Sequence, residues 1–394
     1  MPNIQKHLFT PGPVNMPEVV RQAVNQPMQD HRAPDFHELV HPVLNNLKDV
    51  FRTKDGHVMI FSGSGTSGWE GALNNCLNPG AKLLTSRYGH FSHLWIEMCK
   101  QHGFDIDVID AEWGMTAPIV EYAKILEADK SHKIEAVLIC HNETATGVVS
   151  DVAGLREVLD NLAHPALLFV DGVSSIGSLE FRMDDWGVDV AVCGSQKGFM
   201  LPTGLAILGI SQKAMDVAKT AKSHRSFMDF HTMLASNETG YFPYTPATTL
   251  IHGLGASVKL LLDEGMDIVA KRHHHLAEGV RAAINAWGLE LCAKDPKYYS
   301  DVVSTIVVPE AYDSNAIVGR AYDRYHLSLG GGLARLAGKV YRIGHLGCPT
   351  ELMMLMAISG AEMAMVDCGL DIALGSGVGA AQTKYRELTV SGVV

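Results

Sequence analysis

The sequence lacks the features that mark several large classes of protein. Its 394 residues contain no long uninterrupted apolar run, so we expect no membrane partner and no membrane-spanning helix. The N-terminal stretch has no apolar core of signal-peptide length, so we expect no secretion. The net charge is -11 and Lys and Arg form no basic patch, so nucleic acid is not an expected partner.

Cysteine is sparse and irregularly spaced. The chain has 7 Cys and no Cys-x-x-Cys pair, which is typical of reduced thiols and predicts a cytoplasmic protein. Nineteen His are present, but adjacent residues on a helix face different ways, so His273–His275 cannot converge on one ion. His90 and His93 have no nearby Cys or carboxylate to complete a set. We therefore expect no metal.

A single lysine follows an apolar segment in the middle of the chain. Residues Val188–Cys193 are predicted to form a buried strand, and Lys197 comes shortly after it. It is the only charged residue between Asp189 and Lys213. Burial lowers the pKa of a lysine and makes its amine a usable nucleophile or base, so Lys197 is a candidate Schiff-base lysine. The alternative is a surface lysine at a strand end.

An acid follows the preceding strand in a similar way. Residues Ala166–Val170 form a continuous apolar run, typical of a buried parallel strand, and Asp171 ends it. The carboxyl ends of such strands face the crevice where α/β sheets bind ligands. Pyridoxal 5'-phosphate needs a lysine for a Schiff base and an acid opposite its ring nitrogen. Asp171 and Lys197 together favour that cofactor over the alternative for Asp171, a helix N-cap.

A third segment predicts a phosphate site. A predicted strand, His57–Phe61, is followed by a loop of Gly, Ser and Thr over 62–68 and by a helix-like segment. Amides and hydroxyls at such a helix start bind anions. The loop also reads Gly-x-Gly-x-x-Gly, the dinucleotide fingerprint, which expects an acid about 20 residues further on. The next strand ends in Arg87 and has no such acid, but a nucleotide-binding dehydrogenase stays an alternative.

Strands and helices alternate through the middle of the chain, which predicts an α/β fold with a mainly parallel, seven-stranded sheet in a large domain. After about residue 265 the pattern changes to a smaller C-terminal α+β domain, in which 351–368 is the final predicted helix and the glycines at 330–332 and 375–377 are loops. We place an N-terminal arm at 1–15, the large cofactor-binding domain at 16–264 and the small domain at 265–394. The expected strands of the sheet are His57–Phe61, Lys82–Ser86, Phe104–Ile109, Ala136–Cys140, Ala166–Val170, Val188–Cys193 and Leu205–Ile210.

These segments, in this order, resemble the class V aminotransferases, which are pyridoxal-phosphate enzymes of fold type I. Within that family the chain is most similar to the alanine/serine–glyoxylate aminotransferases, and closest to the bacterial serine–glyoxylate type. The resemblance runs nearly end to end. It rests on the motifs at 10–15 (TPGPVN), 30–34 (DHRAP), 141–147 (HNETATG), 171–177 (DGVSSIG), 194–197 (GSQK), 244–246 (YTP) and 342–347 (RIGHLG).

The resemblance implies roles around the cofactor ring. Lys197 would hold the cofactor and later move the proton, and Asp171 would keep the ring nitrogen protonated. Val173 would pack on one face of the ring and Phe91 on the other, where alanine-type members have a tryptophan. Thr144 would lie near the phenolic oxygen of the cofactor.

Further roles implied by the resemblance concern the phosphate and the substrate. Gly65, Thr66 and Gln196 would bind the phosphate. Thr245 would reach the phosphate of a partner subunit, which implies a homodimer with composite sites, or a higher oligomer. Arg342 would bind the substrate carboxylate, a task that suits a guanidinium group. From the residues alone, a structural ion pair is the preferred reading of Arg342.

The resemblance implies transamination from serine to glyoxylate, giving hydroxypyruvate and glycine. Aspartate or alanine as amino donor stays an alternative, and a class V lyase that uses Cys348 is a more distant one. An aspartate donor needs a second cation for its side-chain carboxylate. The candidates for that cation are Arg32, Arg87, His90 and His93.

Overall fold

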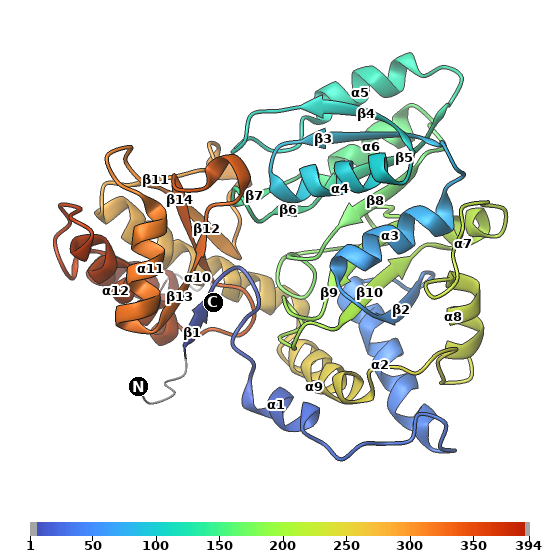
Figure 1. Ribbon diagram of the computed structural model, residues 1–394, viewed down its shortest axis with the longest axis horizontal. Helices are drawn as coiled ribbons and strands as arrows, with labels where there is room; N and C mark the ends of the chain where they lie inside the picture. Colours follow the sequence, from blue (N-terminus) through green and yellow to red (C-terminus); the bar gives the residue numbers. More distant parts are fainter. Residues whose placement is uncertain (1–5, 391–394) are drawn as a thin grey trace.

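Two β-sheets organise the chain, as the computed structural model of the protein shows for residues 6–390 (Figure 1). The larger sheet has seven strands in the order β2-β10-β9-β8-β5-β3-β4. Its strands are β2 His57–Ser62, β3 Lys82–Arg87, β4 Asp105–Asp110, β5 Ile134–Cys140, β8 Leu167–Asp171, β9 Val190–Gly194 and β10 Leu205–Ile210. A separate two-stranded ribbon pairs β6 Asn142–Glu143 with β7 Val148–Val149.

The neighbours β4, β3, β5, β8 and β9 are parallel, and only β10 runs against its neighbours β9 and β2. The strands β8, β9 and β10 are buried at every position, because helices cover both faces of the sheet. The expected α/β fold with a mainly parallel seven-stranded sheet is confirmed. The helices of this part are α1 Glu18–Val24, α2 Phe36–Phe51, α3 Gly65–Cys76, α4 His90–Gln101, α5 Ile119–Ala128, α6 Val152–Asn161, α7 Gln212–Ala218, α8 Phe230–Asn237 and α9 Thr248–Glu264.

The smaller sheet has five strands in the order β1-β13-β14-β12-β11. It draws β1 from the N-terminal arm, which pairs in parallel with β13, so the arm becomes part of the smaller lobe (Figure 1). The elements are β1 His7–Phe9, α10 Met266–Ala286, β11 Glu290–Leu291, β12 Val303–Val307, α11 Ser314–Tyr325, β13 Leu327–Gly331, β14 Val340–Gly344, α12 Glu351–Asp367 and α13 Ser376–Val390, with short 3-10 turns at Pro296–Tyr298 and Ala334–Leu336. The domain boundaries at 15/16 and 264/265 stay predictions.

Two expectations for the small domain were wrong. The helix at 351–368 is not the last one, because α13 follows and begins within the expected loop 375–377. This helix packs on α10, where Gly279 leaves room for the Tyr385 ring, and the Tyr385 hydroxyl donates to Leu276 O at 3.1 Å. Gly330 also lies in strand β13 rather than in a loop. A Cβ atom there would approach Pro11 Cδ to 2.8 Å, so glycine lets the arm pass close to the strand.

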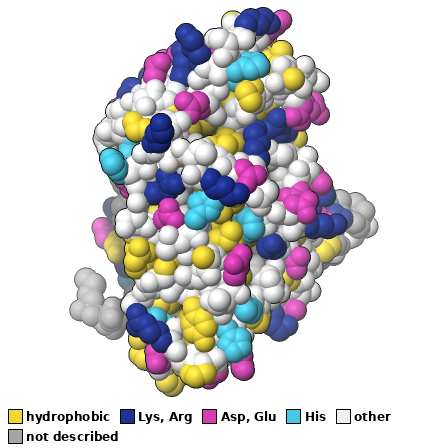
Figure 2. Space-filling model, turned by 90° about the vertical axis from the view of Figure 1, so that its right-hand side faces the viewer, with side chains coloured by type: hydrophobic (Ala, Val, Ile, Leu, Met, Phe, Trp, Pro, Cys, Tyr) yellow, Lys and Arg dark blue, Asp and Glu magenta, His cyan; other side chains and the backbone are white. Residues whose placement is uncertain are grey.

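No helix within residues 6–390 is long and apolar enough to cross a membrane. On the face shown in Figure 2, acidic and basic side chains are interspersed and no broad patch of one sign stands out.

Candidate active site

A cavity of about 200 Å³ opens at the carboxyl ends of β8 and β9. This is the edge at which open α/β sheets bind ligands. Its lining includes all the predicted cofactor-binding residues except Thr245, although their roles stay predictions. The lining residues are Gly12, Pro13, Ser64, Gly65, Thr66, Trp69, Phe91, Thr144, Asp171, Val173, Ser174, Gln196, Lys197 and Thr203.

Lys197 is a buried lysine without a carboxylate partner within ion-pair distance in the described chain. Its amine donates to the backbone carbonyl of Pro11, so the N-terminal arm crosses directly over it. Gly12 makes this approach feasible, because a Cβ atom there would lie 2.7 Å from the Lys197 nitrogen. Burial, together with the nearby Arg342 guanidinium, lowers the pKa of Lys197 to about 8. With that pKa, about a tenth of the amine is neutral and nucleophilic at pH 7 and about half at pH 8.

Asp171 ends β8 and is 4% exposed. Its Oδ1 accepts the Val173 N–H at 2.9 Å, and its Oδ2 lies 3.3 Å from the Cys140 sulfur. Burial raises the pKa of the Asp171 carboxyl, whereas these donors and the Lys197 charge lower it. Asp171 lines the cavity together with Lys197, and it forms no ion pair with a base of the described residues. Such an acid can bind a protonated ring nitrogen.

The start of α3 lines one corner of the cavity and could bind an anion. Ser64 is the N-cap, with its backbone and side chain in a capping box with Ser67, and Gly65 and Thr66 begin the helix. The Gln196 amide lies opposite, with a buried oxygen that has no partner in the described chain. Free helix-start amides and an unpartnered side-chain amide are what a phosphate group needs.

Two side chains define the width of the cavity. Val173 packs against Gly65, where a Cβ atom would lie 2.5 Å from Val173 Cγ2. Phe91 lies in the first turn of α4, which a fully buried carboxylate caps: Glu143 accepts the N–H groups of Phe91 at 3.3 Å and Ser92 at 2.9 Å. Glu143 therefore holds the first turn of α4, which carries Phe91, against the cavity.

Thr144 and Arg342 meet at one side of the cavity. The Thr144 hydroxyl lies 2.7 Å from the Ser174 hydroxyl, and the Thr144 carbonyl accepts from Arg342 Nη1 at 3.2 Å. Arg342 Nε donates to Gly331 O at 3.0 Å. Arg342 is 7% exposed, and no carboxylate of the described residues lies within ion-pair distance. The structural ion pair considered for Arg342 is therefore absent from residues 6–390.

Burial lowers the pKa of Arg342 to about 10, so the guanidinium stays charged at neutral pH. The Glu143 charge acts in the opposite direction but lies beyond ion-pair distance, so an incoming carboxylate would be the direct counter-ion that this buried cation lacks in the described chain. Arg342 lies next to the cavity lining, and its charge is close enough to lower the pKa of Lys197.

The structure does not bring every candidate into this cavity. Thr245 is exposed and lines a separate small pocket with Phe242 and Tyr244. Cys348 is exposed and lies in another pocket with Gly344 and Met353, away from Lys197. A lyase mechanism through Cys348 is therefore not favoured.

None of the candidate cations for a second carboxylate lines the cavity within the described chain. Arg87 pairs with Asp110 at 3.0 Å, and His93 lies 3.8 Å from Glu97. Arg32 is exposed. Burial, with the His93 and Arg342 charges, lowers the pKa of His90.

Sequence reasoning missed several residues of the site. Ser64 belongs to the loop 62–68 but was not singled out there. It could have been predicted, because a Ser before a helix start is a common N-cap. Trp69 lies in the helix-like segment directly after the glycine-rich loop, and Thr203 comes from a segment without a recognisable motif. Cys140 contacts Asp171, and this contact depends on the register of two strands. Glu143 contacts the start of α4, and this contact depends on where that helix is placed.

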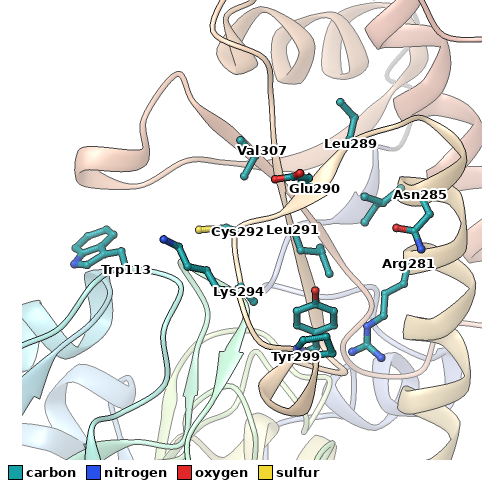
Figure 3. Close-up of a pocket in the computed structure, with 13 residues that line it drawn as sticks. Trp113, Arg281, Asn285, Leu289, Glu290, Leu291, Cys292, Lys294, Tyr299 and Val307 are labelled. Carbon is teal, nitrogen blue, oxygen red and sulfur yellow. The ribbon is translucent and has the colours of Figure 1, made fainter.

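A larger cavity of about 790 Å³ lies between the two lobes and holds none of the predicted site residues (Figure 3). Its cations are already neutralised: Arg281 pairs with Asp301 at 2.7 Å, and Lys294 pairs with Glu112. Burial raises the pKa of its one thiol, Cys292, to about 11. It therefore offers no reactive group comparable to Lys197. Nor does the described chain place three or more His, Cys, Asp or Glu side chains for a metal ion.

Comparison with known proteins assigns the chain to a family. Residues 15–321 match the family described as Aminotransferase class-V. The chain belongs to the class V aminotransferases. It is 56% identical over 386 residues to a serine–glyoxylate aminotransferase of Hyphomicrobium methylovorum, across 98% of this chain and 95% of that one. It is 53% identical over 387 residues to an L-aspartate–glyoxylate aminotransferase of Paracoccus denitrificans, across 98% of each.

The fold agrees with this family. The crystal structure of a pyridoxamine–pyruvate aminotransferase from Mesorhizobium loti superimposes with a TM-score of 0.91 at 25% identity, covering 98% of this chain and 99% of that one. The protein is therefore a pyridoxal-phosphate-dependent aminotransferase of fold type I. The alternative of a nucleotide-binding dehydrogenase was wrong: the glycine-rich loop belongs to an aminotransferase.

The residues of the cavity fit that cofactor. The buried Gln196 side-chain oxygen has no hydrogen-bond partner in the described chain. The oxygen and nitrogen of an amide can exchange places by rotation, so Gln196 can present its N–H groups to a phosphate. The α3 start supplies free amides for a phosphate, Asp171 an acid for the ring nitrogen, and Lys197 an amine of lowered pKa. We expect Val173 and Phe91 to enclose the ring between them.

Proposed function

We propose that this chain transfers the amino group of an amino acid, serine being the favoured donor, to glyoxylate, with hydroxypyruvate and glycine as products. The observation that carries the proposal is the buried Arg342 guanidinium, which has no carboxylate partner in the described chain and lies beside Lys197. This arrangement suits an α-amino or α-keto acid whose carboxylate pairs with Arg342 while its α-carbon faces the lysine. Both relatives described above carry glyoxylate in their names.

The chain's own residues divide the chemistry among them. Pyridoxal phosphate, when bound, supplies the electron sink that stabilises negative charge at the substrate α-carbon. Lys197 would hold the cofactor through its amine, and as a free amine it would take the proton from the substrate α-carbon onto its own nitrogen. Asp171 keeps a positive charge on the ring nitrogen by facing it with a carboxylate.

The remaining residues bind and orient. Gly65 and Thr66 at the start of α3, together with Gln196 after β9, would bind the phosphate, and Thr144 would serve the phenolic oxygen. Arg342 fixes the substrate carboxylate with charge-assisted hydrogen bonds, which sets which bond at the α-carbon is aligned for cleavage.

Serine is favoured over aspartate because the described cavity offers no second cation. Among the lining residues Lys197 is the only Lys, Arg or His, and Arg87 is neutralised by Asp110. An unpaired side-chain carboxylate in a closed site costs several kcal/mol, whereas a hydroxyl needs only neutral hydrogen bonds of about 1 kcal/mol each. Aspartate is the second candidate, because the Paracoccus denitrificans relative named for it is nearly as similar.

The test is the donor half-reaction, followed by absorbance in single turnovers with serine, aspartate and alanine. We expect serine to give the highest rate per concentration of donor, and Asp171→Asn to lower that rate by orders of magnitude. A faster reaction with aspartate than with serine would show that the enzyme is an aspartate–glyoxylate aminotransferase. No reaction with any of the three would refute the proposal.

The proposal extends to a homodimer in the cytoplasm. Thr245 is exposed, and beside it the Phe227 and Tyr244 rings contact each other in a tilted arrangement with centroids 5.4 Å apart, while remaining 45% and 42% exposed. Such exposed aromatic pairs are typical of subunit interfaces. A partner subunit seated there would place its own Thr245 toward this chain's phosphate site.

The homodimer is tested by mixing Lys197→Ala subunits with Thr245→Ala subunits. In a mixed dimer, one site then contains both substitutions and the other site contains neither, so we expect activity to reappear. A monomer with full activity would contradict this.

A further inference from the structure

Asp171 has a neighbour on the next strand that no family motif includes. The parallel strands β5 and β8 pair Cys140 with Asp171 in register, so both side chains leave the sheet on the same face. The Cys140 sulfur lies 3.3 Å from Asp171 Oδ2. Both side chains are buried, at 2% and 4% exposure. The contact between the thiol and the carboxylate is therefore direct and shielded from water.

The Cys140 thiol is the donor in this contact. Burial and the Asp171 and Glu143 charges raise the pKa of the Cys140 thiol well above its usual range, so it keeps its proton. A protonated thiol can donate to one carboxylate oxygen while the Val173 N–H donates to the other. Hydrogen bonds to an ionised acceptor favour the ionised form.

Tyr88 fixes the backbone that carries this thiol. Its hydroxyl donates to the Cys140 carbonyl at 2.5 Å and accepts the Cys140 N–H at 3.1 Å. The Ser150 hydroxyl donates to the same oxygen at 3.0 Å. Tyr88 is fully buried, which raises the pKa of its phenol, so the hydroxyl stays protonated. The carboxyl end of β5 is thus held in one position.

We propose that Cys140 is a positioning residue for Asp171: its thiol holds Oδ2 and keeps the carboxylate ionised and aligned, and Tyr88 holds Cys140 in place. This inference rests on the proposed role of Asp171 opposite the ring nitrogen. Removing the thiol should weaken the binding of the cofactor more than the lost volume explains.

The first experiment measures the dissociation constant of pyridoxal phosphate for cofactor-free protein. Cys140→Ala should weaken binding about fivefold, the effect of one net hydrogen bond, and Cys140→Ser should restore it to within about twofold. Tyr88→Phe should weaken binding in the same direction. Cys76→Ala is the matched control, because Cys76 in α3 is buried to the same 2% exposure but its sulfur lies near the Ala214 carbonyl. Equal effects of the two alanine variants would overturn the inference.

The second experiment needs no cofactor. The infrared S–H stretching band that disappears in Cys140→Ala should shift in Asp171→Asn, because the thiol then faces a neutral amide. A band that does not shift would overturn the inference. If the wild-type protein failed to bind pyridoxal phosphate through Lys197, the proposed function would fall, while a shifted band would still support the contact between Cys140 and Asp171.

Discussion

Gly65 offers the sharpest steric test of the cofactor site. It is the first residue of α3, and an alanine Cβ there would lie 2.5 Å from Val173 Cγ2 and 3.2 Å from Cγ1. Either Val173 or the helix start must move, and overpacking of this kind costs about 1–3 kcal/mol. Gly65→Ala should therefore weaken the binding of pyridoxal phosphate about 5- to 150-fold, since about 1.4 kcal/mol is a tenfold change.

A second substitution separates this clash from other causes. Val173→Ala removes the two methyl groups that the new Cβ meets, so Gly65→Ala should cost less in the Val173→Ala background, with a coupling energy above about 1 kcal/mol. Dissociation constants of the four proteins, measured by absorbance titration of cofactor-free protein, give this energy. Gly319→Ala in α11 is the control, because nothing lies within 4 Å of a Cβ there. Additive effects of the two site substitutions would refute the steric reasoning.

Three further predictions concern charge and pH. Arg342→Gln should lower kcat/KM for serine by about 10- to 100-fold, because hydrogen bonds to a charged group are worth about 1.5–3 kcal/mol; an unchanged value would remove Arg342 from the substrate site. Cofactor capture by Lys197 needs the neutral amine, whose pKa is about 8, so the association rate should rise with pH and level off above 8; a flat profile would contradict this. Burial lowers the pKa of His141, His273 and His345 to about 4, 3 and 4. The unfolded chain takes up their protons near pH 6.5 and the folded chain does not, so at pH 5 each should reduce the free energy of unfolding by about 2 kcal/mol, seen as a lower urea midpoint than at pH 7.

Much of the fold could be predicted because its signals are local. The apolar runs that became β5, β8 and β9 are continuous, and each ends at the residue where the structure ends the strand or within one position of it. Since the carboxyl ends of parallel strands meet at one edge, Asp171 and Lys197 could be placed together before any coordinates.

The rest depends on contacts that the sequence does not encode locally. The pairing of Cys140 with Asp171 follows from strand register, which no motif specifies. The sequence alone favoured a structural ion pair for Arg342, because most buried charges are paired. That no carboxylate of the described residues lies within ion-pair distance could only be learned from the tertiary structure. Helix α13 has few apolar residues, and its place is set by the fit of Tyr385 against Gly279.

The central claim is that this aminotransferase moves nitrogen from serine to glyoxylate through Lys197. The most direct measurement incubates the purified holoenzyme with glyoxylate and serine labelled with heavy nitrogen, and quantifies labelled glycine and hydroxypyruvate by mass spectrometry. We expect the wild-type enzyme to form equal amounts of the two products and the Lys197→Ala variant to form neither. Absence of labelled glycine from the wild-type enzyme, or its formation by Lys197→Ala at a similar rate, would contradict transamination through Lys197.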